Sequence, residues 1–164
     1  MRRLLTTRLL FLWVFVLCSV AMGIALYFQF VRYLMPCMLC VSQRVVIIVL
    51  GVVALVACVH GPGAKGTRVY GALSFLCSLL GCWFAGRQVW LQHLPPDQVP
   101  ACVPGFDFLL QSLPPKDLLV LLFKGTGDCA VVHWTGLGLT IPEWSLLLFL
   151  LILLVGVWQM FRRN

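Results

Sequence analysis

Four cysteines lie near polar stretches of the chain, and their spacing is typical of thiol redox chemistry. Cys37 and Cys40 form a Cys-x-x-Cys pair, whereas Cys102 and Cys129 lie in a separate, proline-rich segment. A Cys-x-x-Cys pair occurs both in redox proteins and in zinc sites. The surroundings of each pair must therefore decide between electron transfer and metal binding.

The Cys37–Cys40 pair lies at the start of a long apolar segment that we expect to be helical. The free N–H groups and the positive dipole end of that helix then point at the sulfurs and favour thiolates. Arg44 follows Cys40 by four residues, which places it one turn further on the same face. A cation inside a membrane usually has a partner, here a thiolate or an oxygen of a molecule dissolved in the bilayer. The alternative is that Arg44 extends to the lipid headgroups.

The second pair, Cys102 and Cys129, lies on opposite arms of a segment rich in proline and glycine. A disulfide between them would be exposed, and exposed disulfides are usually the labile, catalytic ones. The alternative is a structural link that closes the loop. Asp128 should disfavour the thiolate of its neighbour Cys129, which would make Cys129 the poorer nucleophile of the pair.

The four cysteines could instead hold zinc, which takes four ligands in a tetrahedral array, and His93 and His133 are available as well. A zinc site would not explain Arg44, because a cation one turn from the sulfurs serves a thiolate better than a closed metal cluster. We therefore predict no metal. The remaining cysteines lie in apolar segments, where we expect them to act as packing residues: Cys18, Cys58, Cys77 and Cys82.

The composition shows that lipid is the solvent for most of the chain. Of 164 residues, 62% are hydrophobic and only 10% are charged, too few charges to cover a water-soluble domain. Segments at about 9–30, 40–59, 69–91 and 144–161 are long enough to cross a bilayer, and in lipid each must be helical. We therefore predict an all-α, four-transmembrane-helix bundle, with residues 1–164 forming a single integral membrane domain.

The charged residues predict how this bundle is oriented. The net charge is +7, but the basic residues flank the apolar segments and form no continuous patch, so we expect no nucleic-acid partner. Basic residues precede the first segment, separate the second from the third and follow the fourth, whereas all five acidic residues lie in or at the edge of residues 92–142. By the positive-inside rule, both termini are cytoplasmic and the long loop, 92–142, is outside.

Two segments allow a second interpretation. The first apolar segment has the charged start of a signal peptide, but it continues to Phe30, further than a signal sequence needs. Within the long loop, Lys116–Lys124 is an apolar run between lysines, which we interpret as a short interfacial helix on the outer membrane surface. A strand or a partly buried turn is the alternative for so short a run.

Taken together, these residues resemble the bacterial disulfide bond formation protein B (DsbB) family. The resemblance covers nearly the whole chain and lies in Pro36-Cys-Met-Leu-Cys-Val-Ser-Gln-Arg44, in Cys102 within a proline-rich loop, in Gly127-Asp-Cys-Ala130, and in the four-span layout. It implies an inner-membrane enzyme that reoxidises a periplasmic DsbA-like thiol oxidase and passes the electrons to ubiquinone or menaquinone.

The resemblance also implies roles for individual residues. The reduced partner would attack the Cys102–Cys129 disulfide and form a mixed disulfide through Cys102. Exchange with Cys37 and Cys40 would carry the electron pair to the membrane, where Cys40 passes it to the quinone and Arg44 holds a ring oxygen.

His93 matches a histidine that lies near the quinone in some family members. A polar residue expected shortly after it is replaced here by Leu94-Pro95-Pro96, which puts that side of the pocket in question. Two alternatives stay open: a specialised paralogue that serves a dedicated partner, and a metal-binding or structural membrane protein.

Overall fold

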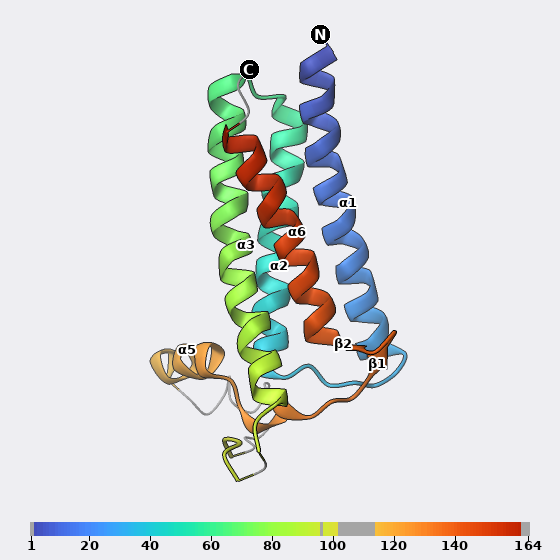
Figure 1. The fold of residues 1–164 in the computed structure, drawn as a ribbon, viewed down its shortest axis with the longest axis vertical. Helices are drawn as coiled ribbons and strands as arrows, with labels where there is room; N and C mark the ends of the chain where they lie inside the picture. The colour runs from blue at the N-terminus through green and yellow to red at the C-terminus, as the bar shows by residue number, and fades with distance from the viewer. Residues whose placement is uncertain (1, 96, 102–113, 162–164) are drawn as a thin grey trace.

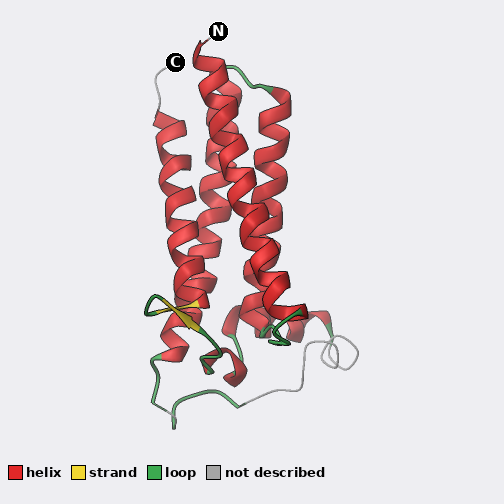
Figure 2. Cartoon of the chain, turned by 90° about the vertical axis from the view of Figure 1, so that its right-hand side faces the viewer, coloured by secondary structure: helices red, strands yellow, loops and turns green. Residues whose placement is uncertain are grey.

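The computed structural model describes residues 2–95, 97–101 and 114–161. In this part of the chain, four helices are long and apolar enough to cross a membrane, which confirms the expected all-α bundle. They run side by side in Figures 1 and 2 and are α1 (Arg2–Phe30), α2 (Met38–His60), α3 (Ala64–Gln92) and α6 (Ile141–Phe161). Each helix contains the corresponding predicted range and extends beyond it at one or both ends, because backbone hydrogen bonding continues past the end of the apolar run.

The two ends of the bundle differ in what they carry. Both chain termini lie at one end in Figure 1, as an even number of spans requires. The start of α2 and the connection between α3 and α6 lie at the opposite end. The N-terminus of the helix that carries the Cys-x-x-Cys pair therefore meets the long loop.

Local sequence explains the limits of α2. Cys37 is its N-cap and is extended, with φ −75° and ψ 172°, as an N-cap residue normally is. Gly61 ends the helix with φ 59°, and its N–H bonds to the carbonyl of Ala57. A positive φ is readily available to glycine, so a Gly at this position stops the helix.

Small residues allow α3 and α6 to pack tightly, and this is the most extensive contact between two helices. A Cβ atom on Gly156 of α6 would lie only 3.1 Å from the carbonyl oxygen of Gly71 on α3. A Cβ atom on Gly81 would lie 2.4 Å from the Phe149 ring. A side chain at either of these two positions would therefore force the helices or the Phe149 ring to shift.

The connection between α3 and α6 contains several short elements in its described part. These are α5 (Pro115–Lys124), the 3-10 helix η1 (Gly127–Ala130) and a hairpin of β1 (Thr135–Gly136) with β2 (Leu139–Thr140), which are antiparallel. The predicted short helix is thus present as α5, while its place on the membrane surface stays a prediction. Gly125 follows α5 with φ 77° and packs against Leu39 and Leu91, which brings η1 to the start of α2.

Candidate redox site

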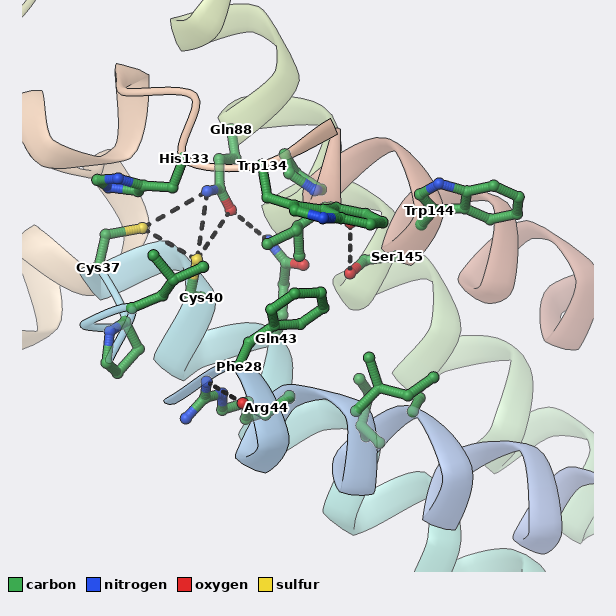
Figure 3. Close-up of a pocket in the computed structure, with 18 of the residues that line it drawn as sticks. Phe28, Cys37, Cys40, Gln43, Arg44, Gln88, His133, Trp134, Trp144 and Ser145 are labelled. Atoms are coloured by element: carbon green, nitrogen blue, oxygen red, sulfur yellow. Dashed lines mark hydrogen bonds between the residues drawn. The ribbon is translucent and has the colours of Figure 1, made fainter. Parts of the chain in front are cut away.

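The Cys-x-x-Cys pair lies in the first turn of α2 with its two sulfurs in contact. Cys37 is the N-cap, and its Sγ lies 3.2 Å from Sγ of Cys40. Both side chains are partly buried and face the cavity drawn in Figure 3. The pair therefore lies at the end of the bundle opposite to the chain termini, where Figure 1 shows the start of α2.

A third sulfur joins this pair from the long loop. Cys129 of η1 is fully buried, and Cys37 donates a hydrogen bond to its Sγ. Backbone N–H groups of Thr126 and Leu39 also donate to Cys129. Leu39 belongs to the first turn of α2, so a free N–H group of that turn is used by Cys129. Cys37 thus lies between Cys129 and Cys40.

These hydrogen bonds set the protonation of the sulfurs outside the spans. The hydrogen bond from Cys37, followed in importance by those from the backbone of Thr126 and Leu39, lowers the pKa of Cys129 to about 6. Donation to Cys129 and Cys40, together with burial, raises the pKa of Cys37. The expectation that Asp128 disfavours the Cys129 thiolate is therefore wrong. Asp128 lines the cavity, while the hydrogen-bond donors around Cys129 lower its pKa.

Two buried glutamines complete the surroundings of Cys37 and Cys40 and were missed in the sequence. Gln88 of α3 is 4% exposed and its Nε2 lies 3.3 Å from Sγ of Cys40 and 3.5 Å from Sγ of Cys37. Gln43 of α2 is 5% exposed and donates from Nε2 to Gln88 Oε1 at 2.7 Å (Figure 3). The available signal was a strongly polar residue inside an apolar span, which usually marks a functional position.

Arg44 lies one turn below Cys40 and is held by α1. Its Nη1 donates to Gln29 Oε1, and its Nη2 donates to the carbonyl of Ala25 at 3.2 Å. The side chain also lines the cavity (Figure 3). The predicted partners were a thiolate and an external oxygen, whereas the described contacts are neutral oxygens. Arg44 therefore brings a positive charge to the cavity wall that no carboxylate neutralises in these contacts.

The cavity has a volume of ≈ 470 Å³ and is bounded by all four long helices and the segment after η1. Its wall between α1 and α6 is apolar, with Leu17, Val20, Ile24 and Leu148 among its residues. Its polar groups gather around Cys40, Arg44 and Gln88. Trp134 packs against Phe28, with ring centroids 5.0 Å apart, at the loop side. An apolar pocket with a small polar end is suited to a lipid-soluble ligand that carries polar groups at one end.

The structure does not bring every predicted residue to this cavity. His93 follows α3, is exposed, and binds the carbonyl of Val89 through Nδ1 at 2.8 Å. Its neighbour Gln92 and the loop residue His133 line the cavity instead. Cys102 lies outside the described residues. Ala101, the residue before it, accepts a hydrogen bond from the N–H of Gly127 at 3.3 Å.

The four remaining cysteines lie within the long helices. Cys18 is buried in the core, and Cys58, Cys77 and Cys82 are partly buried in their helices, consistent with packing roles. Within the ranges that the structure describes, no three His, Cys, Asp or Glu side chains are arranged to hold a metal ion.

A family model and several known proteins that match this chain all carry nearly the same name. The family model described as Disulfide bond formation protein DsbB matches residues 7–159. A protein named Disulfide bond formation protein B from Nitrosococcus oceani is 48% identical over 158 residues, which cover 96% of this chain and 94% of that protein. Its namesake in Stutzerimonas stutzeri is 44% identical over 162 residues, 99% of each chain. Disulfide bond formation protein B 1 of Pseudomonas aeruginosa is 46% identical over 160 residues, 98% of each.

Proposed function

The chain belongs to the DsbB family of disulfide bond formation proteins, and we propose that it transfers electrons from a periplasmic DsbA-like thiol oxidase to a membrane quinone. As a member of this family it is a disulfide-forming redox enzyme and a multi-pass membrane protein. The observation that carries the finer proposal is the series of contacting sulfurs, Cys129, Cys37 and Cys40, which ends at an apolar cavity beside Arg44.

The first exchange takes place in the long loop. A thiolate of the reduced partner attacks Cys102 of the Cys102–Cys129 disulfide, so that a partner–Cys102 disulfide forms and Cys129 leaves as a thiolate. The hydrogen bond between Gly127 and Ala101 supports this pairing, because it holds the residue before Cys102 close to η1. The pKa of about 6 at Cys129 makes it a good leaving group, since thiols of low pKa leave faster.

The second exchange carries the charge to the membrane. The Cys129 thiolate attacks Sγ of Cys37 in the Cys37–Cys40 disulfide. The Cys37–Cys129 bond forms, the Cys37–Cys40 bond breaks, and Cys40 receives the negative charge. The position of Cys37 between the two other sulfurs supports this order. When the partner's second thiol attacks its bond to Cys102, the released Cys102 thiolate attacks Cys129 and restores the Cys102–Cys129 disulfide. Cys37 and Cys40 are then both reduced, and a two-electron acceptor, the quinone, would reoxidise them to their disulfide.

The cavity residues fit a quinone of the ubiquinone or menaquinone type. A quinone bound there would accept two electrons and two protons and leave as quinol. Arg44 would hold a ring oxygen and stabilise negative charge on it, because its guanidinium is fixed by Gln29 and Ala25 at the cavity wall. The apolar wall between α1 and α6 would take the isoprenoid chain and exclude water from Cys40. His93 would have to leave its contact with the carbonyl of Val89 to bind the quinone.

The orientation of the bundle follows from the same proposal. We place residues 1–164 in the bacterial inner membrane as one domain, with both termini cytoplasmic and residues 92–142 in the periplasm. The basic residues at the terminal end and the acidic residues in the loop support this arrangement. An oxidising periplasm would then contain both cysteine pairs.

A quinone-reduction assay tests the proposal. The protein, purified in detergent, is supplied with a reduced DsbA-like dithiol protein, and loss of quinone absorbance is measured. We expect turnover in wild type, loss of turnover in Cys40→Ser, and a raised quinone KM in Arg44→Ala. Cys58→Ser, on the same helix but far from the cavity, is the matched control and should keep wild-type turnover. If wild type reduces no quinone with several such donors, the proposal is refuted. The metal content of the protein would then be measured.

A further inference from the structure

The amide of Gln88 occupies an unusual place between the two sulfurs of the Cys-x-x-Cys pair. It comes from α3, whereas Cys37 and Cys40 belong to the start of α2. Its single Nε2 group has two hydrogens and two sulfur neighbours, at 3.3 and 3.5 Å. Hydrogen bonds to sulfur extend further than those to oxygen, so both distances are within range. Each hydrogen therefore has one sulfur to bind.

The orientation of this amide is determined by Gln43. Gln43 donates from Nε2 to Gln88 Oε1 at 2.7 Å, which directs the Nε2 group of Gln88 toward the sulfurs. In this orientation Nε2 is the amide atom nearer to Cys40 Sγ, at 3.3 Å against 3.6 Å for Oε1; with the opposite orientation the oxygen would be nearer and would repel a developing thiolate. Gln88 Oε1 is also 3.6 Å from Cys40 Sγ, so it can accept the S–H hydrogen while Cys40 is a thiol. The same amide thus serves both protonation states of Cys40.

Burial gives these hydrogen bonds their strength. Both glutamines are at least nine-tenths buried, and the protein interior screens charge far less than water does. A thiolate at Cys40 would otherwise be desolvated in a membrane protein, at high cost. A fixed amide donor at this position acts as an oxyanion hole acts on a developing oxyanion.

We propose that Gln88 is a catalytic residue of the thiol relay, which stabilises the thiolate left on Cys40 by direct hydrogen bonding, and that Gln43 is the positioning residue that orients it. The inference rests on the proposed exchange, in which the Cys37–Cys40 bond breaks as the Cys37–Cys129 bond forms and the charge passes to Cys40. Gln88 binds both sulfurs of the bond that breaks, so its contact with Cys40 strengthens as charge develops there. Both cysteines line the cavity, but Cys40 is the one that carries the thiolate charge.

The test measures the Cys40 thiolate without quinone or partner. In quinone-free protein carrying Cys37→Ala, alkylation of the Cys40 peptide is followed by mass spectrometry as a function of pH. Gln88→Met keeps the side-chain length and removes the donor. Other titratable or charged groups near Cys40 are unchanged in all variants; they are Arg44, Cys129, Asp128 and His133.

We expect Gln88→Met to raise the midpoint pH of Cys40 alkylation by at least about one pH unit, since a hydrogen bond to a charged group contributes that much or more. Gln43→Met should raise it by less, because Gln88 stays but loses its orientation. The matched control is Gln159→Met, which replaces another buried glutamine, on α6, whose Nε2 has no hydrogen-bond partner among the described residues. Its midpoint should equal that of the parent.

Equal midpoints in Gln88→Met and Gln159→Met would overturn the inference. If Gln88→Met does not fold, as shown by loss of its thermal transition, Gln88→Asn provides the same comparison, because its shorter amide cannot reach both sulfurs. The outcome is separable from the proposed function. A protein that reduces no quinone can still show the shift, and a protein that reduces quinone can lack it.

Discussion

The low pKa of Cys129 leads to a quantitative prediction for Cys37→Ala. The pKa of Cys129 falls from an ordinary value of 9.0 to about 6, and the hydrogen bond from Cys37 is the largest cause. A hydrogen bond to a charged group contributes about 1.5 to 3 kcal/mol, which equals about one to two pH units. Cys37→Ala should therefore raise the pKa of Cys129 to between about 7 and 8, while the N–H groups of Leu39 and Thr126 retain the rest.

The fraction of Cys129 that is a thiolate decreases as the pH falls. Because the pKa of Cys129 is lowered, its thiolate is present above pH 6 and is lost as the pH falls through that value. At pH 7, about 90% of Cys129 is thiolate in the parent, against about 10 to 50% in Cys37→Ala. At mildly acidic pH, Cys129 should therefore remain largely a reactive thiolate in the parent, whereas in Cys37→Ala it should be mostly protonated.

The assay is alkylation of the Cys129 peptide across the pH range in which thiols titrate, in fully reduced protein that carries Cys102→Ser. The midpoint, not the absolute rate, reports the pKa, because burial slows the reagent at every pH. Cys58→Ala is the control and should leave the midpoint at about 6, the value for the parent. A parent midpoint near 9.0, or the same midpoint in Cys37→Ala, would refute the reasoning.

Three further predictions follow from packing. Gly156→Ala should lower the stability of the bundle by about 1 to 3 kcal/mol in a denaturation measurement, because its Cβ meets the backbone of α3, whereas Gly23→Ala has open space and should not. Gly125→Ala should slow exchange between the cysteine pairs in stopped-flow measurements by displacing η1; Gly138→Ala, with a similar φ and no close neighbour, should not. Trp134→Ala should raise the quinone KM by up to about tenfold, because Phe28 would lose its aromatic partner at the cavity. An unchanged KM would contradict the place of Trp134 at the cavity.

The fold could be predicted from the sequence because lipid leaves the backbone few choices. An apolar segment of sufficient length must be helical, so the four spans follow from composition and length alone. The second span was predicted to begin at about residue 40, two residues after the observed start of α2 at Met38.

The site was predictable only in part, because its remaining features depend on contacts between distant segments. The pKa of Cys129 depends on Cys37 and Leu39, far away in the sequence, and its neighbour Asp128 was a misleading guide. Gln88 reaches Cys40 only because α3 packs beside the start of α2. Likewise, the position of His93 at the end of α3 did not reveal the direction of its side chain.

The relay itself is tested most directly by linking its two central sulfurs. In a Cys40→Ser, Cys102→Ser variant, Cys37 and Cys129 are left without their usual partners, and a mild thiol oxidant is added before mass spectrometry. The contact between these sulfurs predicts rapid and nearly complete formation of a Cys37–Cys129 disulfide in the membrane-embedded protein. If both thiols stay free under conditions that oxidise the Cys37–Cys40 pair of wild type, the loop does not deliver electrons to α2 in this way.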